Sequence, residues 1–107
     1  MTPNEIATTM KRLFGYETGG NDPWRHLTEG GELDRSACDR LLDEYIPDDE
    51  VVVFVDRQHA LQCGRSEASK YIAEFIKFGD VRVANLTFSS KVKISDIGVG
   101  QGFRRST

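Results

Sequence analysis

A cysteine close to an arginine is the first feature of the chain that could do chemistry. Cys63, Gly64, Arg65 and Ser66 come directly before a segment with helical periodicity. A thiol at the start of a helix and near a guanidinium has a lowered pKa, because both groups stabilise the thiolate. Two hypotheses are open for this segment. One is a small thiol-dependent enzyme that uses Cys63, and the other is an inert thiol in the connection between a strand and a helix.

A histidine near this cysteine offers a second possibility. His59 lies four residues before Cys63, which is compatible with a nucleophile and its base, but no third residue that would orient the histidine is identifiable. The same two residues do not make a metal site, because a structural zinc site needs four ligands. We therefore expect no metal ion and no other cofactor.

A run of glycines near the end of the sequence, Gly98, Gly100 and Gly102, superficially matches the start of a dinucleotide-binding fingerprint. That fingerprint follows a strand, opens a helix and is followed by an acidic residue about 20 positions later. Only five residues follow Gly102, so the match fails. We expect a bend, a bulge or a short edge strand here instead.

Acidic residues are crowded in the first half of the chain. Residues 1–50 carry 12 acids and 5 bases, whereas residues 51–107 carry 5 acids and 9 bases. Such asymmetry suggests a partner that meets mainly one face of the protein. The densest acidic stretch comes immediately before the apolar run 51–55, and it consists of Asp43, Glu44, Asp48, Asp49 and Glu50.

This acidic stretch has two interpretations. The first is an ordinary solvated helix face and turn, in which neighbouring like charges cost roughly a few tenths of a kcal/mol per pair. The second is a mimic of a phosphate backbone, whose carboxylates meet the lysines and arginines of a nuclease cleft, since complementary charge speeds association. We favour the second. Trp24 is a candidate aromatic anchor for the same interface, with a partly buried core position as the alternative.

The basic second half raises the question of nucleic-acid binding. Its cations would contact phosphates while Phe88 or Phe103 stacks on bases. However, the sequence pI of about 5.3 is acidic, whereas a dedicated nucleic-acid-binding domain is normally basic. Alternating lysines also protect a sheet edge from aggregation, so we expect no direct nucleic-acid binding. The cations in question are Lys91, Lys93, Arg104 and Arg105.

Residues typical of helix N-termini indicate where the three predicted helices begin. Thr2 and Glu5 form a capping-box pattern with Pro3 at the first helical position. Asp34 and Ser66 are candidate N-caps for the second and third helices.

Periodicity completes the prediction of the fold. Apolar residues at helical spacing and apolar–polar alternation predict three helices and three main strands. The intervening stretches are expected to be loops, and the order of elements predicts an α+β fold, with three helices packed on one face of a small, mostly antiparallel sheet of three to four strands. The predicted helices span about 3–14, 35–45 and 66–78, the strands 51–55, 81–85 and 91–95, and the loops 16–33 and 56–64.

The length of 107 residues predicts one globular domain, residues 1–107. Apolar residues make up 38% and charged residues 29%, which fits neither a membrane protein nor a disordered chain. The longest apolar run is far shorter than the roughly 20 residues that cross a bilayer. No signal peptide is recognisable, so both cysteines are expected to be reduced thiols in the cytoplasm.

Several short segments resemble a known group of proteins. They are the acidic turn and strand of Asp49–Arg57, the helix start of Gly64–Glu67, the hairpin around Phe88 and the segment Ile97–Gly102. Together they resemble the small immunity proteins of bacterial polymorphic toxin systems, most of all the immunity partners of contact-dependent growth inhibition toxins. The resemblance covers roughly the second half of the chain.

This resemblance implies a non-enzymatic inhibitor in the cytoplasm of a toxin-producing bacterium. Such a protein binds the C-terminal domain of one cognate toxin, often an RNase that acts on tRNA, and blocks its active site or a neighbouring surface. The family offers no shared catalytic residues. The expected contact residues therefore come from the charge pattern, and they are Asp43, Glu44, Asp48, Asp49 and Glu50, with Trp24 as the aromatic anchor.

Overall fold

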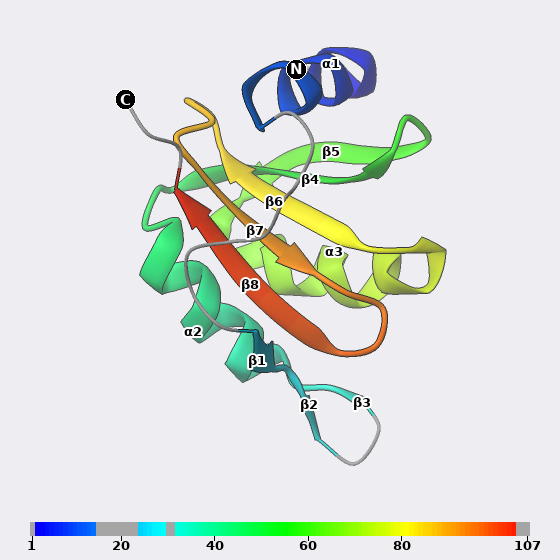
Figure 1. Ribbon diagram of the computed structural model, residues 1–107, viewed down its shortest axis with the longest axis vertical. Helices are drawn as coiled ribbons and strands as arrows, with labels where there is room; N and C mark the ends of the chain where they lie inside the picture. The colour runs from blue at the N-terminus through cyan, green and yellow to red at the C-terminus, as the bar shows by residue number, and fades with distance from the viewer. Residues whose placement is uncertain (1, 15–23, 30–31, 105–107) are drawn as a thin grey trace.

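The computed structural model describes residues 2–14, 24–29 and 32–104 (Figure 1). Within these ranges the elements follow in the order α1 (Pro3–Phe14), β1 (Arg25–His26), β2 (Thr28–Glu29), β3 (Glu32–Leu33), α2 (Arg35–Tyr45), β4 (Glu50–Asp56), β5 (His59–Gly64), η1 (Arg65–Glu67), α3 (Ala68–Phe75), η2 (Ile76–Phe78), β6 (Val81–Asn85), β7 (Ser90–Ile94) and β8 (Val99–Arg104). Here η marks a 3₁₀ helix. The predicted α+β class is confirmed.

Six of these strands form one antiparallel sheet in the order β1-β8-β7-β6-β4-β5, and β2 and β3 form a separate hairpin. The prediction of three to four strands was therefore too low. Strand β5 lies in a segment that was expected to be a loop. Strand β8 lies in the segment that was expected to be a bend, a bulge or a short edge strand, and it is an interior strand instead.

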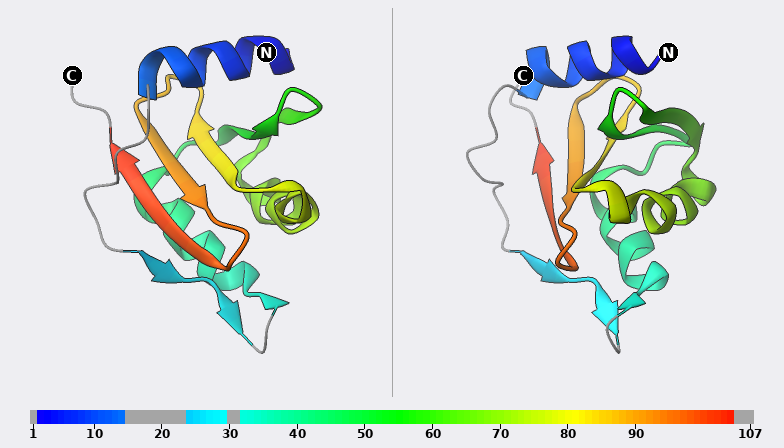
Figure 2. Two further views of the ribbon diagram at one scale, coloured as in Figure 1. Left: turned by 45° about the vertical axis from the view of Figure 1, so that its right-hand side comes forward. Right: turned by 90° about the vertical axis from the view of Figure 1, so that its right-hand side faces the viewer.

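The apolar strand β4 is buried on both of its faces. Val51 and Val53 pack with α2 and α3, whereas Val52, between them, packs against Ile6 and Met10 of α1. Successive side chains of a strand point to opposite faces, so a run without alternation requires a cover on each side. The prediction of all three helices on one face was wrong. Figure 2 shows α1 separated from α2 and α3 by the strands.

Two of the three predicted helix starts are confirmed. In α1, the amide of Glu5 donates to Thr2 Oγ1 at 3.2 Å and the amide of Thr2 donates to Glu5 Oε1 at 3.3 Å, which is a complete capping box. At α2, Asp34 accepts from the amides of Ser36 and Ala37. The third start was misplaced, because Ser66 lies within η1 and α3 begins at Ala68 without a side-chain cap.

The predicted loop 56–64 is the turn and second strand of a hairpin. Asp56 Oδ1 accepts from the amides of Gln58 and His59, both at 2.8 Å, and this turn reverses the chain after β4. Strand β5 then pairs with β4 along its length, with one irregularity between Phe54 and Asp56. Its half-buried residues make a weak alternation, which is why the strand was not recognised from the sequence.

The glycine run forms an interior strand, β8, between β7 and β1. Its glycines are required by the closeness of α2. A Cβ atom on Gly100 would collide with side chains of Leu27 and Leu41, and a Cβ atom on Gly102 would overlap the ring of Tyr45. Because these glycines have no side chain, helix α2 lies directly on the backbone of β8. This role of glycine was not part of the expectation of a bend, a bulge or a short edge strand.

This close approach predicts that Gly102→Ala lowers the free energy of unfolding by roughly 1–3 kcal/mol, because the added methyl group overpacks the contact with Tyr45. Gly64→Ala is the matched control, since a Cβ atom there lies no closer than 3.6 Å to its neighbours. Urea denaturation of both variants and the parent chain measures the difference. Equal stability of the two variants would contradict the contact between α2 and β8.

Candidate functional site

An open hollow of about 500 Å³ lies where the C-terminal half of α2, the loop into β4 and η1 meet. We call it the acidic hollow, because carboxylates make up most of its polar lining. It is lined by Asp39, Asp43, Pro47, Asp48, Asp49, Arg65 and Ser66.

The local sequence explains why these carboxylates gather. Asp39 and Asp43 are four residues apart on α2, so they lie one turn apart on the same side of the helix. Pro47 follows the end of α2 and prevents its continuation. The chain then turns into β4 through Asp48 and Asp49, which brings their carboxylates beside those of the helix.

Arg65 holds the walls of the hollow together. Its guanidinium donates to Asp43 Oδ1 at 2.6 Å, to the backbone carbonyl of Asp39 at 2.7 Å and to Asp39 Oδ1 at 3.4 Å. Its backbone amide donates to the carbonyl of Asp49 at 2.7 Å. The Arg65 side chain is only 12% exposed, whereas those of Asp39 and Asp43 are 45% and 72% exposed, so water screens the two ion pairs and the charge-assisted bond to the backbone carbonyl adds to them.

The charge of the hollow remains negative after this pairing. Four aspartates and one arginine line it, which leaves a formal charge of −3. Arg65 is committed to Asp39 and Asp43. Asp48 and Asp49 are exposed and form no ion pair with another described residue, although Asp48 accepts a long hydrogen bond of 3.5 Å from the amide group of Asn85. Concave surfaces lined by one sign of charge focus the field and attract the opposite charge.

The structure brings together three of the six predicted contact residues. Asp43, Asp48 and Asp49 all line the hollow. Asp39 and Arg65 also line it, and neither was on the predicted list. Asp39 could have been found from its spacing of four to Asp43, whereas the position of Arg65 depends on the hairpin that precedes it.

The other three predicted residues lie elsewhere. Glu44 forms an ion pair with Arg25 of β1, and Glu50 accepts a hydrogen bond from the side chain of Gln62 at 3.1 Å. Trp24 precedes β1, which pairs with the start of β8, whereas the hollow lies near the opposite end of the sheet. Trp24 is 47% exposed, so it is neither a core residue nor part of the hollow.

The environment of Cys63 does not activate its thiol. The cysteine lies within β5, and burial, followed by the nearby charge of Glu67, raises its pKa to about 11. Arg65, which was expected to lower this pKa, points instead to the aspartates of α2. Burial similarly raises the pKa of Cys38 to about 12, with Asp39 and Asp34 adding to the shift.

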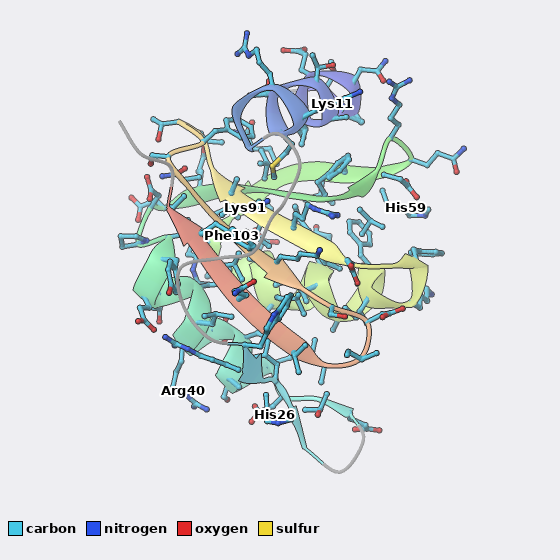
Figure 3. All side chains as sticks on the ribbon, in the orientation of Figure 1. Lys11, His26, Arg40, His59, Lys91 and Phe103 are labelled. Carbon is cyan, nitrogen blue, oxygen red and sulfur yellow. The ribbon has the colours of Figure 1, made fainter. Side chains whose placement is uncertain are left out.

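His59 is also engaged away from the cysteine. Its Nδ1 atom lies 2.9 Å from Asp56 Oδ1, and its ring stacks on Phe78 with the centroids 3.9 Å apart (Figure 3). Across residues 2–14, 24–29 and 32–104, no group of three or more histidine, cysteine or acidic side chains is arranged to hold a metal ion. The hairpin histidine therefore serves packing in this structure.

Two of the candidate nucleic-acid residues, Lys91 and Phe88, are buried. Lys91 is 1% exposed, and its Nζ atom lies 4.5 Å from the centroid of the Phe103 ring. Both side chains are labelled in Figure 3. Its strand β7 is an interior strand, so the expectation that these lysines protect a sheet edge was wrong. Phe88 is buried against α1. Arg105 lies outside the described residues.

Comparisons with known proteins found no matching family model, no matching curated protein and no matching solved structure. Among the described residues, no helix is both long enough and apolar enough to cross a membrane.

The raised pKa of Cys63 predicts slow alkylation by iodoacetamide near neutral pH. Because the thiolate forms only as the pH approaches about 11, the rate is expected to keep rising well above the free-thiol pKa of about 8.5. Cys63→Ser is the control that isolates the contribution of Cys38. A rate that levels off at or below the free-thiol pKa would restore the thiol-enzyme hypothesis.

The contacts of Arg65 predict that Arg65→Lys lowers the free energy of unfolding by roughly 1.5–3 kcal/mol, because a lysine keeps the charge but cannot bond α2 at several atoms. Arg57→Lys, at an exposed position in the hairpin turn, is the matched control and is expected to change little. Thermal and urea unfolding of both variants give the comparison. An equally small effect of both would mean that the guanidinium contacts contribute little.

Proposed function

We propose that this protein is an immunity protein that binds and neutralises a cognate toxin domain, a basic nuclease such as a tRNase. The observation that carries the proposal is the acidic hollow. It concentrates four carboxylates around one arginine, in a chain whose first half is strongly acidic. Asp39 and Asp43 contribute to the fold through Arg65, but the fold gains nothing from the additional charges of Asp48 and Asp49, because neighbouring like charges repel.

Inhibition would work by replacing the phosphates of the substrate. A nuclease holds its substrate with lysines and arginines, and Asp48 and Asp49 offer them carboxylates that Arg65 does not occupy. Charge pairs of this kind at a protein interface couple by roughly 1.5–7 kcal/mol, and complementary potentials raise the association rate. A basic side chain seated in the hollow would then be withheld from RNA.

The resemblance to immunity proteins supports the same class on different grounds. It rests on the acidic turn into β4, the start of η1 and the strand β8, and two of these segments border the hollow. The role would be exercised in the cytoplasm of the toxin-producing cell and would need no turnover. The competing thiol-enzyme hypothesis has no comparable support, because the pKa of Cys63 is raised.

The proposal predicts that a toxin domain is encoded next to the gene for this chain, and that domain is the probe for the test. Expressed alone, that domain should arrest growth, and expression together with this protein should restore growth and yield a stoichiometric complex in size-exclusion chromatography. Continued growth arrest and the absence of a complex would contradict the proposal. A complex with an unrelated toxin domain is the control for non-specific charge attraction.

The charge mechanism makes a separate prediction. The double variant Asp48→Lys with Asp49→Lys is expected to slow association at least tenfold at low ionic strength, because it removes the outward carboxylates of the hollow. The matched control, Glu32→Lys with Glu74→Lys, changes the net charge equally at exposed positions elsewhere. Surface plasmon resonance at low and high salt measures both. Equal slowing by both variants would show that only the net charge matters, and no slowing would eliminate the mechanism.

A further inference from the structure

Phe88, in the connection between β6 and β7, has a strained backbone. Its φ of 55° lies in the left-handed region, which bulky residues rarely adopt because their Cβ atom then crowds a backbone carbonyl oxygen. The residue is nevertheless buried, with 3% of its surface exposed. A conformation of this kind persists only where the surrounding contacts hold it, so the contacts on either side of Phe88 are what maintain the strain.

The first of these contacts is with α1. The Phe88 side chain lies in one buried cluster with Ile6 and Met10 of α1. Figure 2 shows the β6–β7 connection directly beneath α1 in both views. Because apolar surface that leaves water stabilises the conformation that buries it, docking of α1 supports the strained backbone. Among the described residues, this cluster is separate from the larger core that α2 and α3 cover, so α1 can undock while the larger core stays folded.

The second set of contacts is made by Asn85, at the end of β6. Its backbone carbonyl accepts from the amide of Phe88 at 3.0 Å. Its side-chain Oδ1 atom accepts from the amide of Ser89 at 2.9 Å and from that of Ser90 at 3.3 Å. Asn85 is itself buried, so it closes the connection around the strained residue from the side opposite to α1.

Asn85 and Ser90 also contact the edge of the acidic hollow. Since a backbone N–H can only donate, the two amides fix the orientation of the Asn85 side chain and leave its Nδ2 atom as the donor. Nδ2 donates to Asp48 Oδ1 at 3.5 Å, and Ser90 Oγ donates to the carbonyl of Tyr45 at 2.7 Å. Tyr45 ends α2, and Asp48 lines the hollow. We call residues 45–48 the rim of the hollow.

We propose that residues 85–90 couple the docking of α1 to the geometry of this rim. With α1 in place, Phe88 is held in its left-handed conformation, and the bonds of Asn85 and Ser90 hold the rim. When α1 undocks, the ring loses its apolar cover and the backbone of Phe88 relaxes. The bonds from the amides of Ser89 and Ser90 to Asn85 then break, and the rim loses its support.

This coupling regulates the acidic hollow. Coupling between two sites is reciprocal, so a partner that binds the rim also favours the docked state of α1. The identity of that partner, a toxin domain, rests on the proposed function. The coupling itself is a property of the isolated chain and is tested without the partner.

The test is hydrogen exchange of the Ser89 and Ser90 amides in the isolated protein, followed by NMR. Ile6→Ala leaves a cavity under α1 and is expected to raise both exchange rates roughly tenfold or more. Ile94→Ala is the matched control, because Ile94 is equally buried but belongs to the larger core, at the other end of β7 from Ser90. Urea denaturation gives the overall stability of each variant, so that an effect of global unfolding is recognised.

Two substitutions of Phe88 separate the strain from the ring. Phe88→Ala loses the ring and keeps the cost of a left-handed backbone, so it is expected to speed exchange as Ile6→Ala does. Phe88→Gly also loses the ring, but glycine adopts this backbone without strain. The two amides are therefore expected to stay better protected than in Phe88→Ala, and adding Ile6→Ala to Phe88→Gly is expected to have little further effect.

Unchanged exchange in Ile6→Ala would overturn the coupling. So would an equal increase in Ile94→Ala at the same loss of stability, or faster exchange in Phe88→Gly than in Phe88→Ala. The regulation is measured with the toxin domain encoded beside the gene, whose affinity for Ile6→Ala is expected to fall roughly fivefold or more. Unchanged affinity together with faster exchange would overturn the regulation. A parent chain that binds no toxin domain would contradict the proposed function, and the exchange rates would still decide the coupling.

Discussion

The burial of β4 on both faces is the constraint on which the rest of the structure depends. Three consecutive valines have no exposed surface, and each apolar side chain removed from water contributes roughly 1.5–3 kcal/mol. A strand of this kind cannot lie at the surface of a two-layer fold. It needs α2 and α3 below and α1 above, and the hollow exists because α2 must end beside the strand that it covers.

The acidic hollow combines a structural contact with a surplus of charge. Arg65 neutralises the helix carboxylates and ties α2 to the β4–β5 hairpin. The side chains of Asp48 and Asp49 take no part in this contact, although the backbone carbonyl of Asp49 accepts from the Arg65 amide. The fold is therefore stabilised by one half of the cluster, and the other half is available to a partner. This division assigns a structural role to Asp39 and Asp43, whereas a role for Asp48 and Asp49 in binding a partner stays a prediction.

The sequence was sufficient where short-range chemistry decides the structure. The capping box of α1 and the Asp34 cap depend on neighbours within three residues, and both are as predicted. It was insufficient where distant elements decide. The glycines of β8 are explained only by Tyr45 and Leu41 of α2. The same distinction applies to the site. Asp43 and Asp49 were predicted from the crowding of acids in the sequence, whereas the position of Arg65 depends on the register of the β4–β5 hairpin.

The pairing of β1 with β8 has a consequence for how the chain folds. Arg25 lies opposite Gly100, so this side of the sheet closes only when segments far apart in the sequence have met. Contacts of such long sequence separation slow folding, because the entropy of closing the loop is lost before the contacts form. Only residues 95–98 separate β7 from β8, so these two strands pair locally, and β8 is the open edge of the sheet until β1 arrives. A partly folded chain in which β1 has not yet paired therefore exposes the backbone of β8 to pairing with another chain.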